Sequence, residues 1–324
     1  MRVSILRLLF LAATMAVYGA ATPAATAREQ TRRACVGLEQ GPARTVTRIL
    51  DGETIALDDG TELRLIGALT PRASDAGAEP GTWPAEIAAA AELRALLLGK
   101  SVELAFGGER KDRYSRLQAH VYVPAGDAGR WVQGHLLEQG LARAYVVAGN
   151  RACADALLAA ELGAREARRG LWGEATYHAR LADRPSQLAR YRSTFQLAEG
   201  RIATVAQVRG TIHLNFDVDW RRGFSASLRR ADRGLLGADA IDPKALAGRL
   251  VRVRGWIEQR GGGAHGPVIE LSTAGLIEIL DAPSPGAAVP DPNRADRGSS
   301  PHPGTPPEPP QTQAKPPGLI ETGR

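Results

Sequence analysis

The chain has 324 residues, of which 44% are hydrophobic and 23% charged, and its formal net charge is +6. This apolar fraction excludes a fully disordered chain, and the length fits one large domain or two of ordinary size. Aromatic residues make up only 5% of the chain, which argues against a large stacking surface for nucleic acid. All but four of the 41 basic residues are arginines. That excess suits contacts to phosphate or carboxylate, but a base-composition bias of the genome produces the same pattern.

The first 27 residues have the pattern of a cleavable export signal. Arg2 and Arg7 flank the start of an apolar stretch at 8–21, and Ala25-Thr26-Ala27 is a small-x-small cleavage site. The apolar stretch is too short to span a membrane as a helix, and no later stretch qualifies. We therefore expect cleavage near Ala27 and a mature chain that is periplasmic or secreted.

The chain contains two cysteines, Cys35 and Cys153. In an exported protein such a pair is more often bonded than free. We expect a disulfide that ties the beginning of the first domain to a helix near its end. In the chain-entropy model a bridge that closes so long a loop contributes on the order of 4 kcal/mol.

The first domain is predicted at 43–173, after an N-terminal segment at 28–42. Alternating apolar residues and turn signals predict strands at 45–50, 54–57, 62–66, 101–106 and 117–123. Apolar spacing and closing glycines predict helices at 84–98, 131–140 and 152–169. This order of elements indicates an α+β domain.

The second half is predicted to hold a polar connector at 174–198, a β-rich domain at 199–281 and a proline-rich tail. Short strands that form a small barrel or sandwich are expected at 202–208, 212–216, 224–228, 250–257, 268–271 and 276–280. The segments 246–255 and 266–270 look like parts of exported bacterial OB-like modules. Residues 282–324 hold 12 of the 21 prolines, so we expect this tail to be disordered.

Six segments of the first half follow one another in the order typical of the staphylococcal nuclease (thermonuclease) family. They are Arg48-Ile49-Leu50-Asp51-Gly52-Glu53-Thr54-Ile55, Leu63-Arg64-Leu65-Ile66-Gly67 with Thr70-Pro71, Gly99-Lys100-Ser101-Val102, Asp112-Arg113-Tyr114-Ser115-Arg116-Leu117, Gly140-Leu141-Ala142-Arg143, and Ala159-Ala160-Glu161 to Gly170-Leu171-Trp172. The first half thus resembles that family, and the resemblance implies a five-stranded OB-type barrel capped by three helices. With the second OB-like β-barrel, the expected fold class is mainly β with α.

The resemblance also implies a set of site residues. Family members that cleave DNA or RNA use calcium held by two aspartates, a glutamate that acts on the attacking water, and two arginines that neutralise developing charge. The two arginines correspond to Arg64 and Arg116. The first metal aspartate corresponds to Glu53, the neighbouring acid Asp51 is kept, and the carbonyl of Thr70 would face the cation.

Two carboxylates that the family needs are missing. The second metal aspartate falls on Leu69, which cannot bind a metal, and the glutamate falls on Arg72, which cannot act as a base. Because loss of a positioned base typically costs about 10²- to 10⁴-fold in rate, we expect family-type hydrolysis to be lost or strongly reduced. Asp75, Glu79 or Glu86 could replace a ligand, or they could be solvated acids of a loop and a helix start. Calcium is then a cofactor only if such replacements operate.

The same cleft could still bind an anion. Four arginines would make a cationic pocket if they gather there: Arg64, Arg72, Arg113 and Arg116. The resemblance places Tyr114 where the family contacts a terminal phosphate or base, and Tyr145 could flank it. The alternative is that the two family arginines pair with Asp51 or Glu53.

The second domain offers a separate candidate surface. In the strand at 250–257, alternation places Arg252, Arg254 and Trp256 on one face. A basic and aromatic stripe on an OB-type strand can bind single-stranded nucleic acid. The alternative is an ordinary solvated face with one half-buried tryptophan.

Together these features predict an exported protein that binds nucleic acid or another polyanion, with weak or no phosphodiester cleavage. Two alternatives stay open. One is an active metal-dependent nuclease with replacement carboxylates, and the other is a non-catalytic scaffold for an unidentified protein partner. Whether the chain is an enzyme is therefore left open by its sequence.

Overall fold

The computed structural model describes residues 35, 37–73, 75, 83–124, 129–147, 149–229, 242–259, 265–271 and 276–281. The expected export signal, the acid Glu79 and the proline-rich tail lie outside these residues. Within the described ranges, the chain forms no helix of the length and apolarity needed to cross a membrane.

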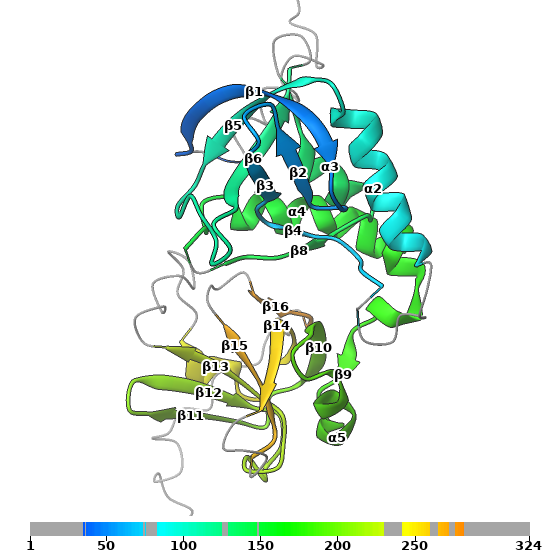
Figure 1. Ribbon diagram of the computed structural model, residues 1–324. Coiled ribbons are helices and arrows are strands. Elements are labelled where there is room, and N and C mark those ends of the chain that lie inside the picture. The colour runs from blue at the N-terminus through cyan, green and yellow to red at the C-terminus, as the bar shows by residue number, and fades with distance from the viewer. Residues whose placement is uncertain are drawn as a thin grey trace, which may run out of the picture. The chain divides into compact units, whose positions relative to one another are not determined.

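Five strands close into the first barrel (Figure 1). They are β1 (Glu39–Ile49), β2 (Thr54–Leu57), β3 (Glu62–Leu65), β5 (Ser101–Phe106) and β6 (Leu117–Val123). The hydrogen-bonded order is β3-β2-β1-β5-β6, and a parallel pairing of β3 with β6 closes the ring. Their alternating pattern turns an apolar face inward, where Val46, Ile55, Leu63 and Val121 are fully buried.

Three helices accompany this barrel: α2 (Pro84–Leu97), α3 (Val132–Glu138) and α4 (Ala154–Glu166). Helix α2 begins with a proline, which suits the first helical position because no backbone donor is lost there. Helix α4 begins directly after Cys153, which is bonded to Cys35 with 4.9 Å between the two Cα atoms. The predicted disulfide is therefore present, and it joins α4 to the segment before β1.

Three short strands of the first half have no counterpart among the predicted elements. β4 (Ala68–Leu69) and β8 (Arg143–Ala144) pair with each other, and β7 (Arg130–Trp131) pairs with β6. Two-residue strands give no detectable alternation, which explains why the pattern missed them. The turn between β3 and β4 needs Gly67, whose φ is +92° and whose added Cβ would lie 2.5 Å from Leu157 of α4.

The segment predicted as a connector contains more regular structure than expected. It holds η1 (Gly170–Gly173), η2 (Ala175–Tyr177), β9 (Arg180–Leu181), α5 (Pro185–Leu188) and η3 (Ala189–Tyr191). In addition, β10 (Phe195–Arg201) begins before the predicted end of the connector at 198. The first strand of the second domain therefore starts earlier than the sequence pattern indicated.

The second barrel repeats the strand order of the first. After β10 come β11 (Thr204–Val208), β12 (Thr211–Asn215), β13 (Ser225–Arg229), η5 (Pro243–Leu246), β14 (Leu250–Gln259), β15 (Pro267–Leu271) and β16 (Ile277–Ile279). The order is β11-β12-β13-β15-β14-β10, and β10 continues into β11 after two residues. When β10 and β11 are counted together as the first strand, β13 is the third strand and β15 the fifth. These two pair in parallel, as the third and fifth strands of the first barrel do. Both halves are thus OB-like, and the predicted fold class, mainly β with helices, is confirmed.

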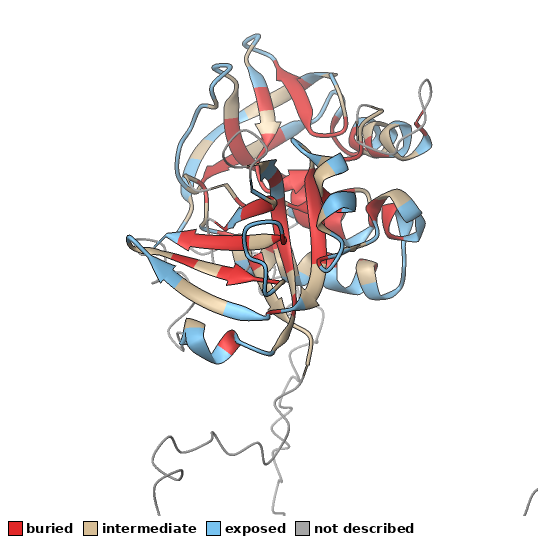
Figure 2. Ribbon diagram, turned by 90° about the horizontal axis from the view of Figure 1, so that it is seen from below, coloured by how far each residue is buried: buried red, intermediate tan, exposed pale blue. Residues whose placement is uncertain are grey.

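In the described part of the chain, buried apolar side chains form three clusters, and Figure 2 shows many buried residues along the strands. One cluster fills the first barrel and a second fills the other, around Phe224, Val251 and Ile269. The third contains side chains from both halves, among them Leu69 from β4 and Leu197 from β10. The two barrels therefore share apolar contacts besides the chain that connects them.

Candidate functional site

The turn between β1 and β2 buries Glu53 completely. The Asp51 carboxylate accepts a hydrogen bond from the backbone N–H of Glu53, with 2.8 Å between the two atoms. The backbone N–H of Thr70 donates to Oε2 of Glu53 at 3.2 Å. Thr70 therefore presents its backbone N–H to this carboxylate. Burial raises the pKa of Glu53, although the guanidinium groups of Arg64 and Arg72 act in the opposite direction.

Two arginines contact the same oxygen of Glu53. Nη2 of Arg64 lies 2.9 Å from Oε1, and Nη2 of Arg72 donates to that atom as well. The side chain of Arg64 is 21% exposed and that of Arg72 is 39% exposed. The sequence left open whether Arg64 would be a phosphate ligand or an ion-pair partner. The structure pairs it with Glu53, and it adds Arg72 to the pair.

This donor set does not fit calcium. Calcium takes six or more oxygen ligands, whereas Oε1 of Glu53 already faces two cations. Within the described ranges, no group of three or more His, Cys, Asp or Glu residues is placed to hold a metal ion. We therefore derive no step of chemistry through calcium at this position.

Leu69, to which the resemblance assigns the second metal aspartate, is a core residue. Its side chain is 5% exposed and belongs to the apolar cluster of Trp83, Leu171 and Trp172. Leu69 also borders the cleft, beside Arg72 and Arg143. The missing ligand is thus replaced by packing, not by another polar group.

The two described acids that could replace a ligand have other partners. Oδ2 of Asp75 accepts hydrogen bonds from the backbone N–H of Arg72 at 3.1 Å and from the Tyr177 hydroxyl at 3.0 Å. Oε2 of Glu86 accepts from the backbone N–H of Ala73 at 2.8 Å. Both carboxylates stabilise the segment after β4 and the start of α2.

The loop between β5 and β6 positions Arg116 through Asp112. Oδ1 of Asp112 accepts the backbone N–H groups of Tyr114 at 2.9 Å and Arg116 at 3.0 Å, and Oδ2 accepts Nε of Arg116 at 2.8 Å. Burial would raise the pKa of Asp112, but these hydrogen bonds outweigh it and lower the pKa. Arg116 therefore pairs with Asp112, and not with Asp51 or Glu53.

Tyr114 stands out from this loop with 63% of its surface exposed. The guanidinium carbons of Arg113 and Arg116 lie 4.8 Å and 5.1 Å from the centre of its ring. The loop thus presents an exposed ring with two cations against it, an arrangement suited to a phosphate beside a flat group.

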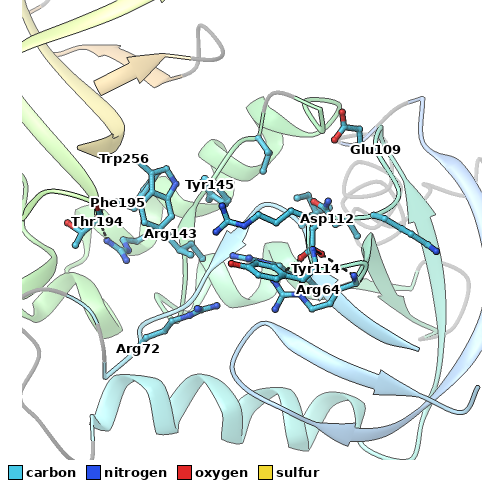
Figure 3. A pocket seen from close by; sticks show the side chains of 18 of the residues that line it. Arg64, Arg72, Glu109, Asp112, Tyr114, Arg143, Tyr145, Thr194, Phe195 and Trp256 are labelled. Carbon is cyan, nitrogen blue, oxygen red and sulfur yellow. Dashed lines mark hydrogen bonds and ion pairs between the residues drawn. The ribbon is translucent and has the colours of Figure 1, made fainter. Parts of the chain in front are cut away.

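A cleft of about 1170 Å³ connects this loop with the second barrel (Figure 3). Its basic residues are Arg64, Arg72, Lys111, Arg113, Arg116 and Arg143. Its acidic residues are Glu62, Asp75, Glu109, Asp112 and Glu258. The predicted gathering of four arginines is present, but the acids leave the described part of the cleft lining only slightly positive.

Arg143 lies deep in this cleft and has a structural role. Nη1 donates to the backbone carbonyl of Phe195 at 2.8 Å, and the guanidinium lies over the rings of Tyr177 and Phe195. Burial lowers the pKa of Arg143, and the nearby Asp75 opposes that effect. Arg143 ends the segment 140–143, which is one of the segments that resemble the family, so the sequence pointed to this residue. Nothing in the sequence indicated its contact with β10.

Three aromatic rings form the end of the cleft on the side of the second barrel, and we call them the aromatic corner: Tyr145, Phe195 and Trp256. Their ring centres are 5.5–6.2 Å apart and each pair meets edge to face. Trp256 is 41% exposed, whereas Phe195 is buried behind it. Tyr145 and Trp256 were predicted as binding residues, but Phe195 was missed because its segment was predicted as connector.

Arg252 and Arg254 do not form the free basic stripe that alternation predicted beside Trp256. The side chain of Arg254 is 4% exposed, and its two terminal nitrogens bind the two carboxylate oxygens of Glu161 in α4 at 2.9 Å and 2.8 Å. Arg252 binds Glu199 at 2.6 Å and Glu278 at 2.7 Å. Their charges are already neutralised, so the predicted stripe is corrected to a set of ion pairs.

The fold and the cleft define a class of protein: an OB-like barrel with capping helices, joined to a second barrel of the same strand order. Residues 62–174 match the family model described as staphylococcal nuclease homologue. With the closed five-stranded barrel, this match shows that the first half carries a staphylococcal nuclease-like domain, as the resemblance predicted. Such a domain suggests nuclease-related binding of nucleic acid. No curated protein matches the chain.

Proposed function

We propose that this protein binds nucleic acid, or another polyanion, in the cleft and does not cleave phosphodiesters efficiently with calcium. One observation carries the proposal. Glu53, the carboxylate that remains at the expected metal position, is buried between Arg64 and Arg72 while Leu69 belongs to the core. Hydrolysis of the family type needs an open carboxylate set, whereas phosphate binding needs only cations and hydrogen-bond donors.

The loop of Tyr114 supplies the contacts for binding. Arg113 and Lys111 line the cleft, and Arg116 is held in place by Asp112. Cations that are oriented in advance bind phosphate at little cost in conformational entropy. The loop is therefore the first contact that we assign to a phosphate.

The disulfide supports a location outside the cytosol. Bridges such as Cys35–Cys153 persist in oxidising compartments, namely the periplasm and the exterior of the cell. We accordingly propose that the protein acts on polyanions in one of these compartments.

Labelled single-stranded DNA and RNA, incubated with the purified protein and calcium, magnesium, manganese or a chelator, test the proposal directly. We expect binding that weakens steeply with added salt and no metal-dependent cleavage. Arg113→Ala should make the slope of log affinity against log salt concentration shallower by about one unit, the value for one lost phosphate contact. Metal-dependent cleavage that Arg64→Ala abolishes would contradict the proposal.

A gain-of-function variant tests the physical reason. Leu69→Asp combined with Arg72→Glu supplies two carboxylates and removes one guanidinium from Glu53. We expect calcium-dependent cleavage in this double variant, after circular dichroism has shown that it folds, and none in the original chain. Equal cleavage by both proteins would show that these two positions do not determine activity.

A further inference from the structure

We propose that the aromatic corner is a base-stacking subsite, so that the cleft selects single-stranded nucleic acid with accessible bases. The inference rests on the proposed function and adds to it the class of ligand. It assigns recognition of the bases to the second barrel and contact with phosphate to the loop of Tyr114.

The geometry of the corner suits stacking. Trp256 lines the cleft and is 41% exposed, and it is the cross-strand partner of Phe195 in the pairing of β14 with β10. The rings of Tyr145 and Phe195 meet the Trp256 ring edge to face, with interplanar angles of 81° and 72°. Edge-to-face neighbours fix the plane of the indole ring, and 41% of Trp256 stays exposed at the cleft. A flat partner can therefore stack on Trp256.

The corner is held in place by buried contacts before any ligand binds. Arg254, two residues before Trp256 on β14, forms the buried bidentate pair with Glu161 of α4. The backbone carbonyl of Phe195 accepts a hydrogen bond from Arg143 of β8. Both contacts tie the second barrel to the first beside the cleft. A stacking ring that is already positioned loses little entropy when it binds.

The small net charge of the described cleft lining explains why stacking would add to the affinity. Among the described residues, six basic and five acidic side chains line the cleft, so a polyanion without further contacts gains only modest attraction there. A single strand offers phosphates to Arg113 and flat bases to Trp256, and base–aromatic stacking does not depend strongly on sequence. In a duplex the bases are already stacked on one another, and a sulfated sugar chain has no flat faces.

A comparison of two oligomers with equal numbers of phosphates separates the contribution of base stacking from that of charge. Oligothymidylate and an abasic oligomer of the same length are titrated with the full chain and followed by fluorescence anisotropy. We expect oligothymidylate to bind more tightly by roughly 5- to 150-fold, the range for one stacked base. Trp256→Leu should lower its affinity to that of the abasic oligomer, whereas Trp256→Phe, which keeps an aromatic face, should retain part of the difference.

Trp220 provides the matched control in the same barrel. It is 52% exposed and stacks on His265, with ring centres 6.2 Å apart, but it is not among the residues that line the cleft. Trp220→Leu should leave both affinities unchanged. The subsite is refuted if the unmodified chain binds both oligomers equally, or if Trp256→Leu weakens both to the same extent. Equal, salt-dependent binding of both would leave the proposed function intact, whereas no binding of either at low salt would refute that function itself.

Discussion

Replacing Arg254 by methionine removes one partner of the ion pair between β14 and α4. The side chains of Arg254 and Glu161 are 4% and 1% exposed, and two nitrogen–oxygen contacts of 2.8 Å and 2.9 Å join them. The backbone N–H of Ala144 also donates to Glu161 at 2.6 Å, but it cannot neutralise the charge. Breaking a buried pair by removing one partner costs about 3–5 kcal/mol, compared with about 0–1 kcal/mol for an exposed pair.

Urea unfolding followed by circular dichroism measures this cost. We expect Arg254→Met to lower the free energy of unfolding by about 3–5 kcal/mol. The control is Arg229→Met, because Arg229 and Glu270 form a pair at 3.5 Å whose side chains are 61% and 49% exposed. That variant should cost less than about 1 kcal/mol.

A double variant tests the cause of the loss. Glu161→Leu combined with Arg254→Met removes both charges from the buried site, and such replacements are often close to neutral. We therefore expect the double variant to be more stable than Arg254→Met alone. If Arg254→Met costs no more than the exposed control, water reaches the pair and the pair does not hold the aromatic corner rigidly in place.

Three further predictions concern the first barrel. Burial lowers the pKa of His120 to about 4, and Trp131 donates to its Nδ1. Because the unfolded chain takes up this proton near pH 6.5, stability should be full above that pH and fall by about 3 kcal/mol toward pH 4. His120→Asn should flatten that slope in urea titrations, and an unchanged slope would contradict the assignment. Reduction of the bridge between Cys35 and Cys153, which are 118 residues apart, should cost about 4 kcal/mol, and an equal Tm with and without reductant would argue against it. Leu69→Asp alone should lower the free energy of unfolding by about 3 kcal/mol because it places a carboxylate among buried apolar side chains, whereas Leu69→Met should cost less than about 1.5 kcal/mol.

The sequence by itself determined much of the local structure of this protein and which residue types stand at the positions that the resemblance assigns to the site. Strands with four or more alternating residues are recognisable because the period of two reflects which face meets a core. The disulfide was predictable because the chain has only two cysteines. The resemblance assigns a metal aspartate to Leu69 and a base glutamate to Arg72, and the sequence shows directly that neither residue carries a carboxylate.

Only the tertiary structure decided which charges are available for binding. Arg64 and Arg72 bind Glu53, and Arg254 binds Glu161, which is 93 residues away in the sequence. Alternation tells which side of a strand Arg254 occupies, but not whether that side meets water or another barrel. Partners of this kind are set by packing between distant elements, and that packing has no local pattern. The aromatic corner has the same origin, since Tyr145, Phe195 and Trp256 meet only when the two barrels do.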